Sequence, residues 1–222
     1  SQLGLFDEDQ KAIRTIFKEP FGLVLVTGPT GSGTTTPLFS VLRSLDLTDR
    51  NVITVEDPIE FRLPLVRQTQ LNAQAGYDFA NAVRYFLRHD PDIIMVGEIR
   101  DLETAEIAIQ AALTGHLVMS TVHTNDAPGA ITRMVDMGVE PFLVASSVVG
   151  ILAQRLVRTL CPECKESYVA SEEEIRNIGL SPDMVGPEAK FWRGQGCNAC
   201  IGTGYQGRLG IYELMIPSDE IR

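Results

Sequence analysis

The sequence has little positive charge. It holds only four lysines among 222 residues, and its formal net charge is -10. A nucleic-acid surface needs cations clustered opposite the phosphates, so we expect no nucleic-acid partner. Also missing is a run of about 20 predominantly apolar residues, the length that a membrane-spanning helix needs. Two stretches without charged residues, 21–42 and 107–125, are broken by Gly, Ser, Thr or His.

The N-terminus shows no secretory signal, because the chain turns acidic and polar soon after Leu5. We therefore expect a cytoplasmic protein. Hydrophobic residues make up 44% and charged residues 22%, an ordinary globular composition. The chain starts without Met, and residues 218–222 look like the start of a helix. We expect it to be a piece of a longer protein.

Short apolar runs alternate with helix-like segments over the first 120 residues. The expected strands are 23–26, 52–55, 93–96 and 117–121. The expected helices between them are about 35–45, 79–87 and 102–114. Alternating strands and helices of this kind predict an α/β fold, with a parallel sheet flanked by helices.

The character of the sequence changes after Arg158, where the first cysteines appear and glycine then becomes frequent. We place a boundary near Leu160. The expected organisation is a core over 1–160, a tetracysteine subdomain over 161–207, and the start of a truncated C-terminal segment over 208–222.

A glycine-rich stretch follows the first predicted strand and opens a helix, which is the context that a phosphate-binding loop (P-loop) requires. Glycines let backbone N–H groups turn toward phosphate oxygens, and the helix N-terminus adds partial positive charge. The Thr35 hydroxyl stands where Mg²⁺ would be coordinated. The candidate nucleotide-binding residues in this stretch are Gly28, Pro29, Thr30, Gly31, Ser32, Gly33, Thr34, Thr35 and Thr36.

One element of the P-loop motif is missing. The motif calls for lysine directly after Gly33, and this chain has Thr34. Thr carries no charge, and no lysine lies between Lys18 and Lys165 to replace it. The alternative interpretation of the stretch is a tight glycine turn that binds no nucleotide.

Polar residues also follow the other three predicted strands. Ligands bind beyond the carboxyl ends of strands in open parallel sheets, so we expect these side chains near the phosphate loop. Glu98 is a candidate to position water and support Mg²⁺, and Arg100 can pair with a carboxylate or a phosphate. The polar residues at the strand ends are Glu56, Asp57, Glu60, Glu98, Arg100, Asp101 and His123.

Plainer roles compete for some of these residues. Glu60 and Asp101 can be solvated, and Asp101 can simply cap its helix. His116 follows a helix stop at Gly115, which favours a structural histidine. For Glu98 and His123, the position at a strand end favours function.

The four cysteines form two C-x-x-C pairs, Cys161 with Cys164 and Cys197 with Cys200, separated by 32 residues. Each pair can offer two thiolates to one ion, and together they complete a tetrahedron. Disulfides are disfavoured in a cytoplasmic chain. A thioredoxin-like redox site would need only one such pair. We therefore predict structural Zn²⁺.

Taken together, these segments resemble the secretion ATPases of the GspE/PilB group, which power type II secretion and type IV pilus assembly. The similar motifs are Gly28–Thr36 (Walker A), Ile53–Phe61 (Asp box), Asp90–Asp101 (Walker B region), Gly115–Asn125 (His box) and Leu152–Arg158, which leads into the cysteines. The tetracysteine element points to the secretion and assembly branch.

The resemblance implies a RecA-like fold, ATP and Mg²⁺ as ligands, and a homo-hexamer of the full-length protein. It implies that Glu56 or Glu98 activates the attacking water and that His123 contacts or senses the nucleotide. It also implies an N-terminal region that supplies arginines to the phosphates. The implied partners are the inner-membrane platform and cytoplasmic adaptor proteins, which would hold a cytoplasmic protein at that membrane.

Two functions follow from these observations. The first is a motor subunit whose ATP hydrolysis powers secretion or pilus assembly. The second is a non-hydrolysing, nucleotide-binding or structural ring subunit of the same machinery. Thr34 favours the second for this molecule, while Glu98, Thr35 and His123 favour the first for its lineage.

Overall fold

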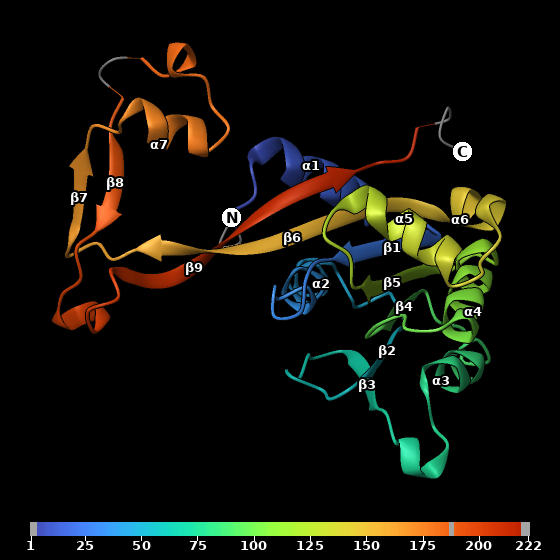
Figure 1. Ribbon diagram of the computed structural model, residues 1–222. Coiled ribbons are helices and arrows are strands. Elements are labelled where there is room, and N and C mark those ends of the chain that lie inside the picture. The colour runs from blue at the N-terminus through green and yellow to red at the C-terminus, as the bar shows by residue number, and fades with distance from the viewer. Residues whose placement is uncertain (1–3, 187–188, 219–222) are drawn as a thin grey trace. The chain divides into compact units, whose positions relative to one another are not determined.

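The computed structural model describes residues 4–186 and 189–218. The chain divides into two compact units, one made of Ser1–Arg155 with Gly210–Arg222 and the other of Leu156–Leu209. Each unit has its own sheet (Figure 1). Within the described residues, none of the helices combines the length and the apolarity that a bilayer crossing requires.

A mostly parallel sheet with helices on both faces forms the first unit, as the sequence predicts. The described strands pair in the order β3-β2-β4-β5-β1-β6-β9. The strands are β1 (Gly22–Thr27), β2 (Val52–Glu56), β3 (Val66–Gln70), β4 (Ile93–Val96), β5 (Leu117–Val122), β6 (Val148–Leu160) and β9 (Tyr205–Met215). The helices are α1 (Asp7–Ile16), α2 (Thr35–Ser44), α3 (Phe79–Phe86), α4 (Leu102–Leu113), α5 (Ala127–Asp136) and α6 (Pro141–Ser147), with a 3-10 turn at Ala73–Ala75.

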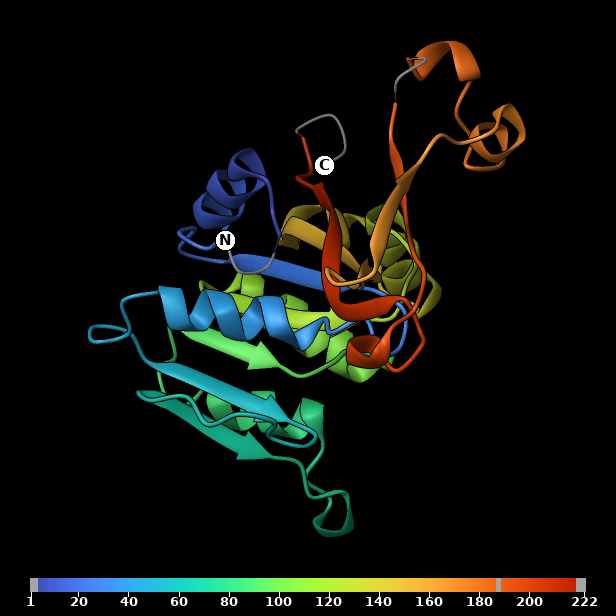
Figure 2. The same ribbon diagram turned by 90° about the vertical axis from the view of Figure 1, so that its left-hand side faces the viewer.

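Strand β1 lies inside the sheet, and its six residues are all buried. Successive side chains of a strand point to opposite faces. Leu23 and Leu25 accordingly pack into a core with α3 to α6, whereas Val24 and Val26 pack into a second core with α1 and α2. Figure 2 shows α1 and α2 along the sheet. Burial on both faces explains why β1 is a continuous apolar run.

Helix α4 begins at an N-cap. The carboxylate of Asp101 accepts a hydrogen bond from the backbone N–H of Thr104 at 2.8 Å. The capping role considered for Asp101 is therefore realised. The carboxylate occupies one of the backbone donors that the first helical turn leaves unpaired.

We expect Asp101→Ala to lower the free energy of unfolding of the first unit by about 1 kcal/mol, because it leaves that donor unpaired. Asp101→Asn should keep most of the stability, since Asn caps nearly as well. Urea unfolding followed by circular dichroism would measure both variants. Equal losses in the two would assign the effect to the charge of Asp101 and not to its hydrogen bond.

The second unit is small and has few buried apolar side chains. It contains a two-stranded antiparallel sheet of β7 (Lys165–Tyr168) and β8 (Phe191–Gly194), helix α7 (Glu172–Asn177), and 3-10 turns at Pro182–Met184 and Asn198–Cys200. Ser171 and Glu174 form a capping box at the start of α7. Among the described residues of this unit, the buried hydrophobic side chains are Cys161, Ile175 and Cys200. Such a core is too small to fold without a covalent or metal staple.

The two compact units divide the chain at residues other than the expected domain boundaries. The second unit covers Leu156–Leu209, compared with the expected 161–207. The residues from Gly210 onward belong to the first unit, because β9 joins the large sheet beside β6. Pairing of this kind between distant segments is set by tertiary contacts and not by local sequence.

Candidate functional site

The glycine-rich stretch connects β1 to α2 as a compact loop. The backbone N–H of Ser32 donates to the Pro29 carbonyl at 3.0 Å. Gly31 and Gly33 have φ of +81° and +72°, in the left-handed region that favours glycine. Within the described residues, the N–H groups of Thr30, Gly31 and Gly33 donate no hydrogen bond. These donors are free to bind an anion.

Strand β6 lies directly against this loop. A Cβ on Gly28 would come within 2.4 Å of the Gln154 carbonyl oxygen, so no side chain fits there. The Gln154 side chain is 3% exposed, and its amide donates to the carbonyls of Ser32 at 2.6 Å and Gly33 at 3.4 Å. Gln154 was not among the predicted site residues. The sequence feature that could have indicated a role for Gln154 is its position within the Leu152–Arg158 motif.

The ends of β1 and β5 are joined by threonine side chains. The Thr27 hydroxyl donates to the Val122 carbonyl at 2.9 Å and accepts from the Thr124 N–H at 2.9 Å. These bonds hold the loop after β5, which carries His123, beside the start of the phosphate loop. Sequence reasoning missed Thr27 and Thr124, because their partners are about a hundred residues away in the chain.

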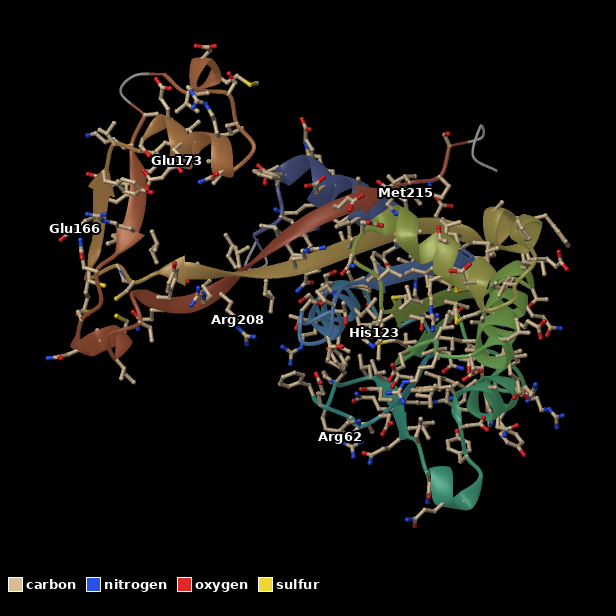
Figure 3. The ribbon with its side chains drawn as sticks, in the orientation of Figure 1. Arg62, His123, Glu166, Glu173, Arg208 and Met215 are labelled. Atoms are coloured by element: carbon tan, nitrogen blue, oxygen red, sulfur yellow. The ribbon has the colours of Figure 1, made fainter. Side chains whose placement is uncertain are left out.

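Glu98, Arg100 and His123 form one cluster at the ends of β4 and β5. The Glu98 carboxylate is bonded by the Arg100 guanidinium and lies 3.3 Å from Nε2 of His123. Nδ1 of His123 lies 3.4 Å from the Gly28 carbonyl oxygen. Figure 3 marks His123 in the first unit. The expected meeting of Glu98, Arg100 and His123 beside the phosphate loop is thus present in the structure.

Charge complementarity holds this cluster together. The hydrogen bond to Glu98 raises the pKa of the Arg100 guanidinium above its ordinary value, against a smaller opposing effect of burial. Arg100 therefore remains a cation beside Glu98. The Glu98 side chain is 14% exposed and that of His123 is 50% exposed, so both can be reached by a ligand.

Glu56 occupies a different environment at the end of β2. It is 3% exposed, and its Oε1 accepts hydrogen bonds from the Thr54 hydroxyl at 2.6 Å and the Gln68 amide at 2.9 Å. Bonds of this kind satisfy a buried carboxylate without a ligand. Glu56 is therefore more deeply buried than Glu98 and already has partners within the protein.

Two further predicted positions have local partners. The Thr35 hydroxyl donates to the Glu60 carboxylate at 3.3 Å, so these two oxygens meet at the start of α2. Nδ1 of His116 lies 2.9 Å from the Ala111 carbonyl oxygen. This contact ties His116 to the end of α4, which agrees with the structural role favoured for it.

The four cysteines of the second unit converge. Their sulfur atoms all lie within 4.8 Å of one another, with 3.8 Å between Cys161 and Cys197, between Cys164 and Cys200, and between Cys197 and Cys200. Sulfur atoms of a tetrahedral zinc site with bonds of about 2.3 Å stand about 3.8 Å apart. The arrangement could hold a metal ion.

The surroundings of these thiols differ from one another. The backbone N–H of Cys197, with a smaller contribution from that of Gly204, lowers the pKa of the Cys200 thiol to about 6. Burial raises the pKa of the Cys164 thiol to about 12. Four thiolates packed this closely repel one another, so a cation is needed for all of them to be deprotonated together.

The fold and this loop define a class of protein. A glycine-rich loop after a central strand, with carboxylates at the ends of neighbouring parallel strands, is the architecture of P-loop nucleoside triphosphatases. The profile of the family described as "Type II/IV secretion system protein" matches residues 1–222. The chain belongs to this family.

Curated relatives and solved structures agree with that assignment. The chain is 55% identical to type II secretion system protein E of Pseudomonas aeruginosa over 99% of its own length and 43% of that protein. It is 52% identical to the type IV pilus assembly ATPase PilB of Thermus thermophilus over 94% of its length and 23% of that protein. The structure of the pilus retraction motor PilT with bound ADP matches with a TM-score of 0.68 and 33% identity, over 99% of this chain and 53% of that one. The chain thus spans less than half the length of these curated relatives.

Proposed function

We propose that the chain is the nucleotide-binding region of an ATPase motor subunit that powers type II secretion or type IV pilus assembly. The observation that carries the proposal is the phosphate loop, with unpaired N–H donors, beside the cluster of Glu98, Arg100 and His123. The relatives named as type II secretion and type IV pilus assembly proteins support the assignment to this machinery. In this proposal, the full-length protein is a cytoplasmic homo-hexamer, held at the inner membrane by platform and adaptor proteins.

Each part of the site has a role in this proposal. The loop 28–36 binds the phosphates through its backbone donors and the N-terminus of α2. Glu98 orients and activates the attacking water, because it is accessible and lies close to the loop. His123 contacts both Glu98 and the Gly28 carbonyl, so it can report a change at the loop to the carboxylate. Glu56 serves as a buried acceptor that fixes the end of β2.

The residues fit Mg²⁺ at the start of α2. The Thr35 hydroxyl and the Glu60 carboxylate, 3.3 Å apart, are oxygen groups of the kind that Mg²⁺ prefers. Thr35 would hold the ion, and Glu60 and Glu98 would support it. A bound Mg²⁺ would neutralise charge on the β- and γ-phosphates. Arg100 contributes a further cation beside Glu98.

We also propose that Cys161, Cys164, Cys197 and Cys200 hold a structural Zn²⁺. The spacing of their sulfur atoms and the small apolar core of the second unit support this assignment. The ion would serve the fold of this unit and take no part in hydrolysis.

One observation favours a second function, that of a non-hydrolysing subunit. Thr34 begins α2 without a cap bond from its side chain, and it places no charge at the position where the motif has lysine. Restoring the charge by Thr34→Lys should tighten ATP binding by about tenfold, the effect of a charge-assisted contact. Turnover should rise further, because charge develops on the phosphates during transfer.

Titration calorimetry with MgATP and a phosphate-release assay would compare the two proteins. Thr15→Lys, at an exposed position of α1 outside the phosphate loop, is a matched control that adds the same charge. Equal affinity and equal rates for Thr34→Lys and the unchanged chain would show that Thr34 is not a defect. The non-hydrolysing function would then lose its support.

A further inference from the structure

Gln154 is a buried polar side chain that the proposed function does not use. It lies on β6, one residue after Ala153, which pairs with Thr27 at the end of β1. It is 3% exposed, and its side-chain carbonyl oxygen Oε1 has no hydrogen-bond partner among the residues that the structure describes. Leaving a buried acceptor unpaired costs free energy. An apolar side chain at this position would avoid that cost. The hydrogen bonds that the amide N–H groups donate therefore point to a function for Gln154.

Those bonds go to the phosphate loop. The Gln154 amide donates to the carbonyl of Ser32 at 2.6 Å and to that of Gly33 at 3.4 Å, while its main-chain carbonyl is the group that a Cβ on Gly28 would strike. Gln154 therefore lies against the loop at two places, at Gly28 through its main chain and at Ser32 and Gly33 through its side chain.

The consequence follows from the planarity of the peptide bond. In a trans peptide, the C=O of one residue and the N–H of the next point in opposite directions. When Gln154 holds the Ser32 carbonyl toward β6, the N–H of Gly33 must point away from β6. The Gly33 carbonyl accepts from the Thr36 N–H at 3.0 Å as well as from Gln154, so Gln154 shares the orientation of the Thr34 N–H with the first turn of α2. The N–H of Gly33 is one of the loop donors that have no partner among the described residues.

We propose that Gln154 is a positioning residue for phosphate binding, which aims the N–H groups of Gly33 and Thr34 at the ligand. The proposal rests on the proposed function of the loop. Its importance is greater in this chain than in one with lysine at position 34, because backbone donors supply more of the interaction when no side-chain cation is present.

Two isosteric variants test the role. Gln154→Met removes both N–H bonds, and we expect it to weaken the binding of MgADP by about threefold to tenfold. Gln154→Glu replaces the donor with a carboxylate that faces two carbonyl oxygens. That environment raises the pKa of the introduced carboxyl, whose protonated form can still donate to Ser32. We expect the Glu variant to bind MgADP nearly as well as the unchanged chain at pH 5.5, and about tenfold or more weakly at pH 8.

The unchanged chain and the Met variant are titrated over the same pH range as controls. They show how far His123, Glu98, Arg100 and Arg155 contribute to the pH dependence of MgADP binding. Gln110→Met, at an exposed position of α4, is the matched control for a Gln-to-Met change. If the Met variant does not fold, the mobility of the Gly33 amide in the Glu variant without nucleotide decides the matter, because repulsion of the phosphates plays no part there. We expect an ordered amide at pH 5.5 and a more mobile one at pH 8. Unchanged affinity in the Met variant, or a loss in the Glu variant that is the same at both pH values, would overturn the proposal.

A measurement without nucleotide separates this proposal from the proposed function. ¹⁵N relaxation of the Gly33 amide should show an ordered loop in the unchanged chain and a more mobile one in Gln154→Met. If the unchanged chain binds no MgADP, the proposed function fails. Equal mobility of Gly33 in both proteins would then overturn the role of Gln154 as well, and greater mobility in the variant would support its hold on the loop.

Discussion

Replacing Cys197 with Ser should unfold the second unit while leaving the first unit folded. The described part of the second unit buries few apolar side chains, so its stability depends on the four converging thiols. Structural Zn²⁺ in small metal-binding modules contributes on the order of 10–16 kcal/mol to folding at neutral pH. Loss of one thiolate removes much of that contribution. The first unit has its own cores on both faces of a large sheet and should keep its structure.

Elemental analysis of protein purified without added metal should give one zinc per chain, and about none in Cys197→Ser. NMR spectra should lose dispersion for residues 156–209 and keep it for the large sheet. Asn198→Ser, at the exposed neighbouring position, is the matched control and should retain zinc. Less than about half occupancy in the unchanged chain, or a disulfide among these cysteines, would contradict the assignment.

Replacing Glu98 with Gln should reduce ATP hydrolysis by about 10²- to 10⁴-fold, the usual contribution of a general base. The measurement belongs in a Thr34→Lys background and a chain able to form a ring, where turnover is high enough to show the loss. Nucleotide affinity should change much less, because the backbone donors of the loop are unaffected. Glu56→Gln should cost less than Glu98→Gln, since Glu56 is buried and already bonded by Thr54 and Gln68.

Steady-state phosphate release and a separate titration with MgADP would give the two quantities. Glu103→Gln is the matched control, because Glu103 is an exposed partner of Arg84 on the surface of α4. A larger loss for Glu56→Gln than for Glu98→Gln would reverse the assignment of the base. Equal losses of rate and affinity would indicate a general disruption of the site.

Some of the structure could be predicted from the sequence because the signal is local. The apolar run at 23–26 forms β1, and the loop that follows has glycine at the positions with positive φ. Asp101 caps α4 as its position before the helix indicates. Strand β3 was missed, because every residue after Val66 is polar and none of its residues is fully buried. Strands β6 and β9 were also missed. In β9 and the second half of β6, most residues are exposed and form no apolar run.

The sequence by itself determined the α/β class, the family, the four strands β1, β2, β4 and β5, and the pairing of the cysteines into one cluster. Each of these depends on residue periodicity or on the spacing of short motifs along the chain. The tertiary structure alone decided which of the polar residues touch. It brought His123 to Glu98, and it placed Gln154 against a loop more than a hundred residues earlier. Contacts between distant segments follow from strand order and register, which no local pattern encodes.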